Sequence, residues 1–93
     1  MSVPSPRPTA RQIEAILQAT FAPAQLEVHD DSAAHAGHAG AAEGSHFSVR
    51  MVSERFVGVG RVGRHRLVYD ALRDLMTQGI HALALDTRAP GEH

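Results

Sequence analysis

The sequence predicts one two-layer α+β domain, in which helices cover one face of a three-stranded mixed β-sheet. Apolar residues recur at helical spacing in two stretches, 13–21 and 67–76. Apolar and polar residues alternate over 26–30 and 46–52, as they do in strands with one buried face, and 80–86 is the last predicted strand. These stretches give the order α-β-β-α-β, and a chain of 93 residues has room for one domain only.

The first helix is predicted to begin after Thr9. Thr9 and Gln12 match a capping box, in which each side chain satisfies a free backbone amide of the first turn. One apolar stripe then follows at helical spacing: Ile13, Ile16, Leu17 and Phe21. Pro23 ends the helix, and residues 1–8, which contain three prolines, are predicted to be a disordered tail.

The first strand is predicted over 26–30, with Leu26 and Val28 facing the core and Glu27 and His29 facing water. Residues 31–44 hold three glycines, several alanines and no large apolar side chain, so no regular structure is predicted there. A loop of this length in a small domain is usually functional or disordered.

The second strand, 46–52, precedes a helix predicted over about 61–78, and the last strand follows Gly79 at 80–86. Because a helix joins these two strands, they should be parallel through a right-handed crossover. Gly79 is placed to end the helix in a left-handed conformation. Residues 89–93 contain Pro-Gly and are predicted to fray. The buried face of the helix is expected to be Leu67 (or Val68), Ala71, Leu72, Leu75 and Met76.

Composition excludes several classes of function. The chain has no cysteine, so any metal that it holds must use imidazole, carboxylate or a partner's sulfur. It has no apolar run near the roughly 20 residues that cross a bilayer, and its first residues lack the apolar core of a secretory signal. A cytoplasmic location without membrane contact is therefore expected. No nucleophile elbow or paired carboxylates occur, so the chain is not expected to be an enzyme.

Charge is distributed unevenly, although the net charge is only −1. Six of the nine arginines lie between positions 50 and 73, where only Glu54 and Asp70 oppose them. No arginine occurs from 22 to 46, where Glu27, Asp30, Asp31 and Glu43 are found instead. The domain should therefore have a basic end and an acidic end, which can steer a charged partner.

Four blocks of sequence resemble the BolA family, in matching order and at matching separations. The likeness extends from about Ile13 to Thr87. The blocks are Ser45-His46-Phe47, Val52-Ser53-Glu54-Arg55-Phe56, Arg64-His65-Arg66-Leu67-Val68-Tyr69 and Ile80-His81-Ala82-Leu83-Ala84-Leu85. The resemblance implies a class II KH-like fold and a BolA-like domain over residues 9–88. Gly60 and Gly63 have the spacing of the RNA-binding KH loop, but no aromatic residues for base stacking lie nearby.

The resemblance also implies a function. BolA-like proteins pair with a monothiol glutaredoxin and glutathione to share one [2Fe–2S] cluster. In the family, one ligand is a histidine or cysteine of the long loop, and the other is the histidine that opens the last strand. His35, with His38 as a competitor, matches the first, and His81 matches the second. The chain would then be a non-enzymatic adaptor in cluster handling or in iron or redox sensing.

Structural alternatives exist for each histidine. His35 and His38 could simply be solvated, and strand alternation places His81 with Leu83 and Leu85, on the core face. An open sheet edge at the first residue of the strand would instead leave His81 accessible. The remaining histidines, His29, His46, His65 and His93, are interpreted as edge, structural or solvated residues.

A second function is implied by the same family, whose members are also described as DNA-binding transcriptional regulators. The residues that could neutralise phosphates are Arg61, Arg64, His65, Arg66 and Arg73. A solvated helix face, or a docking face for an acidic partner, would account for the same residues.

Overall fold

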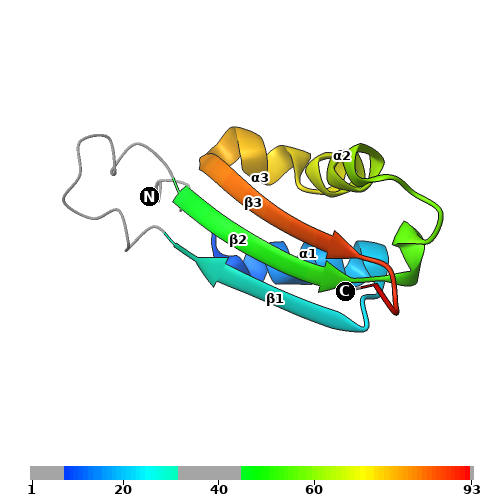
Figure 1. Ribbon diagram of the computed structural model, residues 1–93. Coiled ribbons are helices and arrows are strands. Elements are labelled where there is room, and N and C mark those ends of the chain that lie inside the picture. The colour runs from blue at the N-terminus through cyan, green and yellow to red at the C-terminus, as the bar shows by residue number, and fades with distance from the viewer. Residues whose placement is uncertain (1–7, 32–44, 93) are drawn as a thin grey trace, which may run out of the picture.

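The computed structural model describes residues 8–31 and 45–92, and it has the predicted α-β-β-α-β order (Figure 1). The predicted tail and most of the 31–44 loop lie outside these residues, with Pro8 and Asp31 as the exceptions. The elements are α1 (Ala10–Phe21), β1 (Gln25–Asp30), β2 (Ser45–Val52), the 3₁₀ helix η3 (Glu54–Phe56), α2 (Arg61–Ala71), α3 (Arg73–Gln78) and β3 (Ile80–Arg88).

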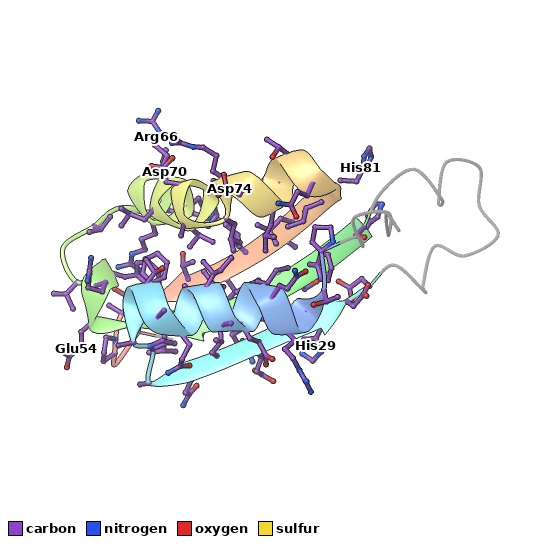
Figure 2. The ribbon with its side chains drawn as sticks, turned by 180° about the vertical axis from the view of Figure 1, so that it is seen from behind. His29, Glu54, Arg66, Asp70, Asp74 and His81 are labelled. Carbon is purple, nitrogen blue, oxygen red and sulfur yellow. The ribbon has the colours of Figure 1, made fainter. Side chains whose placement is uncertain are left out.

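The three strands form one mixed sheet in the order β1-β2-β3. β1 runs antiparallel to β2, while β2 and β3 are parallel, as expected for strands joined through a helix. The helices of the described residues all lie on one face of the sheet, and no described helix covers the opposite face (Figures 1 and 2). The predicted two-layer α+β architecture is therefore confirmed.

Helix α1 begins with the predicted capping box. The Thr9 amide donates to Gln12 Oε1 at 2.8 Å, and the Gln12 amide donates to Thr9 Oγ1 at 3.2 Å. The helix ends at Phe21, and Ala22 takes a left-handed conformation with φ of 42° before Pro23. Its buried stripe packs on the sheet through Ile13, Leu17 and Phe21, with Ile16 partly buried.

The core lies between the helices and the covered face of the sheet. From β2 it takes Phe47, Val49 and Met51, which confirms the predicted alternation in that strand. Leu26 and Val28 of β1 are partly buried against it, while Glu27 and His29 are exposed, also as predicted. Ser53 is fully buried beneath η3, which the sequence did not predict.

The single helix predicted over 61–78 is divided at Leu72, whose ψ of 11° interrupts regular geometry between α2 and α3. Of the two candidates for its buried face, Val68 is fully buried and Leu67 is 41% exposed. Leu72 and Leu75 are buried as well. Gly79 follows α3 with φ of +138°, a positive value that favours glycine.

Residues 89–92 form a turn after β3, within the segment 89–93 that the sequence predicts to fray, and His93 lies outside the described residues. β3 extends to Arg88, two residues past the predicted boundary, and Ala89 is only 4% exposed. The Glu92 amide then donates to the Ala89 carbonyl at 3.1 Å, which closes a turn over Pro90-Gly91. The Glu92 side chain contacts α2, so this turn is joined to the rest of the domain.

Candidate functional site

Three of the four histidines in the described residues lie at one end of the sheet. His29 is near the end of β1, while His46 and His81 are each the second residue of a strand, in β2 and β3. β1 ends where β2 and β3 begin, at one end of the sheet, and Figure 2 shows His29 and His81 at that end. The fourth, His65, is on α2.

A register shift at the start of β3 determines where His81 lies. Ser45 pairs with Ile80, but His46 pairs with Ala82, so His81 is the extra residue of a β-bulge. The bulge lets both Ile80 and Leu83 pack toward the core, which simple alternation would forbid. His81 is therefore exposed, and the alternative that placed it in the core with Leu83 and Leu85 is wrong.

His81 also lies beside His46. Their imidazole centroids are 5.3 Å apart, with an interplanar angle of 45°. From the sequence, an edge or structural role is predicted for His46, and this contact is not. The sequence did contain a signal for it, since both residues lie at the starts of two strands that are predicted to be parallel neighbours, and such strands begin at the same end of a sheet.

The other two predicted cluster ligands, His35 and His38, lie outside the described residues. The described residues that flank the segment 32–44, Asp31 and Ser45, form hydrogen bonds close to His46 and His81. The Asp31 amide donates to the His46 carbonyl at 2.7 Å, and the Ser45 amide donates to the Gly79 carbonyl at 3.0 Å. The Ser48 hydroxyl also donates to the Asp31 carboxylate. The segment thus leaves and re-enters the fold at the edge that carries the His46–His81 pair.

Arg64, which we considered for DNA binding, is occupied by contacts within the domain. Its side chain is only 12% exposed, and it forms a two-point ion pair with Glu92 at 2.5 and 2.8 Å. Its guanidinium also donates to the Val59 carbonyl at 2.6 Å and to the Thr87 carbonyl at 3.2 Å. These acceptors hold Arg64 as a structural residue, and the Glu92 carboxylate raises its pKa further above the usual value.

The other basic residues of the helix differ in their surroundings. Arg61 and Arg66 are exposed, and Arg66 points outward from α2 (Figure 2). Arg73 is exposed but lies 3.0 Å from the Asp70 carboxylate, and Asp74 follows on α3. His65 is half-buried. The outer face of α2 and α3 therefore carries both signs of charge.

A hollow of about 700 Å³ lies between the start of α2 and the end of β3. Its charged lining combines Arg61, Arg64 and Arg88 with Asp86 and Glu92. Arg88 donates to the Asp86 carboxylate at 2.8 and 3.2 Å, and this contact is the main cause that lowers the pKa of Asp86. Of these arginines, Arg64 and Arg88 have carboxylate partners within the domain, Glu92 and Asp86.

Within 8–31 and 45–92, no group of three or more histidine, aspartate or glutamate side chains could hold a metal ion. Helices in the same ranges are too short or too polar for any of them to cross a membrane. A metal bound by His46 and His81 would therefore have to complete its coordination with other donors, such as water or a partner's sulfur.

Comparison with known proteins gives consistent results. Residues 17–92 match the family described as BolA-like protein. An uncharacterised protein from Sinorhizobium, encoded in the cobS 5′ region, is 45% identical over 83 residues, which cover 86% of this chain and 89% of that protein. The Escherichia coli DNA-binding transcriptional regulator BolA is 45% identical over 76 residues, covering 82% of this chain and 70% of that one.

Solved structures agree with this. The BolA domain of SufE1 from Arabidopsis thaliana superimposes with a TM-score of 0.79 at 43% identity, and the match covers 90% of this chain and 94% of that one. The chain spans only 22% of the chloroplastic and mitochondrial SufE-like protein 1 of the same plant.

Proposed function

Because this chain belongs to the BolA-like protein family, we propose that it is a non-enzymatic adaptor that shares a [2Fe–2S] cluster with a monothiol glutaredoxin and glutathione. The observation that carries this proposal is the exposure of His81. The bulge turns this imidazole away from the core, at the end of the sheet where Asp31 and Ser45, which flank the histidine-bearing segment 32–44, also form their hydrogen bonds.

The donors that the chain offers fit a shared cluster better than one held alone. A [2Fe–2S] cluster requires four ligands, which are usually cysteine thiolates, and histidines can replace two of them on one iron. The chain has no cysteine, and its described residues offer no group of three possible ligands. The sulfur must therefore come from a partner.

In this proposal His81 supplies one nitrogen and a histidine of the loop, His35 or His38, supplies the other. The sulfur donors belong to the glutaredoxin and to glutathione. When bound, the cluster would supply one-electron chemistry at a potential that histidine ligation raises. The role of the polypeptide is to hold His81 in its exposed position at the start of β3. The Ser45–Ile80 pairing and the bulge that follows it do this.

A reconstitution experiment tests the proposal. The chain is mixed with a cluster-loaded monothiol glutaredoxin and glutathione, and visible absorption and circular dichroism are recorded. A heterodimer with a spectrum different from that of the glutaredoxin homodimer is expected, and pulsed paramagnetic resonance of the reduced cluster should detect coupling to imidazole nitrogen.

His81→Ala should abolish the new spectrum, while His29→Ala, which removes an exposed histidine at the same sheet edge, should leave it intact. An unchanged glutaredoxin spectrum on mixing, or a heterodimer spectrum that persists in His81→Ala, would refute the adaptor function.

A second candidate function is DNA binding, which is favoured by the 45% identity to the regulator from E. coli. The exposed Arg61 and Arg66 on α2 could contact phosphates. Arg64 is removed from the candidate set, because Glu92 and two backbone carbonyls occupy its donors. Two exposed arginines would support weak, salt-sensitive binding, so we rank this function second.

A further inference from the structure

We propose that His46 and His81 form a bis-imidazole site for a divalent transition-metal ion, such as Zn²⁺ or Cu²⁺, in the isolated chain. This site is distinct from the proposed shared cluster, because it needs no partner protein and no loop histidine. It rests on the contact between the two rings, on their exposure and on the strand pairing that holds them.

The distance between the rings matches that of two imidazoles on one metal. A Zn–N bond is about 2.0–2.1 Å long, so a coordinated imidazole centroid stands about 3.2 Å from the metal, and two such rings at the tetrahedral angle have centroids about 5.2 Å apart. The observed separation of the His46 and His81 centroids is 5.3 Å. The rings are tilted by 45° and are not stacked face to face.

The backbone beneath the two histidines is fixed. His46 pairs with Ala82 in the parallel ladder, and its carbonyl accepts the Asp31 amide at 2.7 Å. Ile80, the residue before His81, is buried and pairs with Ser45, whose amide donates to the Gly79 carbonyl at 3.0 Å. Each imidazole is therefore attached to ordered backbone, which reduces the entropy lost when a metal ion fixes both side chains.

Exposure leaves room for the remaining ligands. His81 is exposed and His46 is partly exposed, so water can complete a four-coordinate shell. Imidazole is a donor that Zn²⁺ and Cu²⁺ favour, while Mg²⁺ and Ca²⁺ prefer oxygen. We therefore expect selectivity for transition metals, with Cu²⁺ bound more tightly than Zn²⁺.

Nuclear magnetic resonance can test this site in the full chain. Zn²⁺ is titrated into the ¹⁵N-labelled chain without a partner, and amide shifts are followed, since this readout locates the site even when binding is weak. Saturable shifts are expected at 45–47 and 80–82. Removing a group that only hydrogen-bonds to a metal ligand lowers metal affinity by about 10–100-fold. Removing a ligand itself, His46 or His81, should therefore weaken binding by at least about tenfold. Mg²⁺ should cause no saturable shift.

The variants are His46→Ala, His81→Ala, the control His29→Ala and the double variant His35→Ala/His38→Ala. The last two should bind Zn²⁺ as the wild type does. Should His46→Ala fold poorly, His46→Asn keeps a polar side chain of similar size at the position and tests the same ligand. The metal site is refuted if shifts concentrate at 32–44 and disappear in the double variant, or if both single variants bind as tightly as the wild type.

The Zn²⁺ titration and the glutaredoxin reconstitution, made on the same chain, distinguish this metal site from the proposed shared cluster. A chain that forms the heterodimer spectrum with glutaredoxin but shows no Zn²⁺ response at 45–47 and 80–82 refutes the metal site alone. A chain that binds Zn²⁺ through His46 and His81 but leaves the glutaredoxin spectrum unchanged refutes the adaptor function alone.

Discussion

Arg64 of α2 and Glu92 near the end of the chain form a two-point ion pair, with nitrogen–oxygen distances of 2.5 and 2.8 Å. The Glu92 carboxylate also accepts the Ala89 amide at 3.1 Å, while Arg64 donates to the carbonyls of Val59 and Thr87. The guanidinium lies 5.8 Å from the centroid of the buried Phe56 ring. The contacts of Arg64 and Glu92 thus connect the start of α2, the end of β3 and the final turn.

The stability of the domain should depend on this ion pair in a pH-dependent way. The contact with Arg64 lowers the pKa of Glu92 from 4.5 to about 2. Because the folded state holds this proton less tightly than the unfolded state, the contribution is fully present above about pH 4.5 and is lost as the pH falls toward 2. Glu92→Gln should therefore melt at a lower temperature than the wild type at pH 7, and the difference should disappear near pH 2.

Thermal melts monitored by circular dichroism across this pH range measure the difference. Asp86, whose pKa Arg88 also lowers, contributes to both proteins and cancels in the comparison. Glu14→Gln, on the exposed side of α1, is the matched control and should melt as the wild type at every pH. A constant gap between Glu92→Gln and the wild type down to pH 2 would contradict the proposed linkage.

Ser53→Ala should destabilise the domain more than its small change in volume suggests. Ser53 is fully buried, its hydroxyl donates to the Phe21 carbonyl at 2.8 Å, and its oxygen accepts the Arg55 amide at 3.1 Å. Leaving such buried groups without partners costs about 1–3 kcal/mol. Urea unfolding gives the free energy, and Thr77→Ala, an exposed hydroxyl on α3, should stay within about 0.5 kcal/mol of the wild type. Equal effects of the two substitutions would contradict this role.

The sequence predicted the elements whose residues act locally. The Thr9–Gln12 capping box, the stripe from Ile13 to Phe21 and the alternation around Val49 each depend on neighbours a few positions apart. The choice between Leu67 and Val68 could not be made in this way, because both fit a helical stripe. It depends on the direction in which α2 crosses the sheet, which tertiary packing sets.

The candidate site was predictable only in part, for a similar reason. His81 was identified, but its exposure depends on the bulge opposite His46, and simple alternation places it in the core. Arg64 was expected to be available to DNA, because the sequence around it gives no sign of its ion pair with Glu92, which is 28 residues away. Contacts over such separations leave no local pattern, so they become visible only in the folded chain.

DNA binding, the second candidate function, should depend on Arg61 and Arg66. Their combined replacement by alanine removes two exposed charges from α2, so it should weaken binding and reduce the slope of log affinity against log salt by roughly two. Fluorescence anisotropy at several salt concentrations measures both quantities. A control double variant, Arg11→Ala/Arg55→Ala, removes two exposed arginines from other elements and should bind nearly as the wild type. Equal losses in both variants would indicate generic electrostatics.

Gly79→Ala should destabilise the domain by about 1–3 kcal/mol, because side chains rarely adopt the φ of +138° found there. Space is not the problem, since an added Cβ would stand 3.5 Å from Pro8, an ordinary contact. The strain would act next to Ile80 and His81, so the amide resonances of 80–82 should shift in the variant. Chemical denaturation gives the free energy, and an unchanged value would show that the backbone adjusts at this position without cost.

Gly60→Ser, in contrast, should stabilise the domain. Gly60 is the N-cap of α2 and has no side-chain oxygen to accept an amide of the first turn. Its φ of −71° and ψ of 166° suit serine, and an added Cβ meets no atom within 4 Å. A capping hydrogen bond and a less flexible unfolded chain should together add about 0.5–1 kcal/mol to the free energy of unfolding. Gly60→Ala, which has no capping oxygen, is the matched control, and the urea midpoint of the serine variant should exceed that of the alanine variant. The reverse order would show that the first turn of α2 is not limited by its cap.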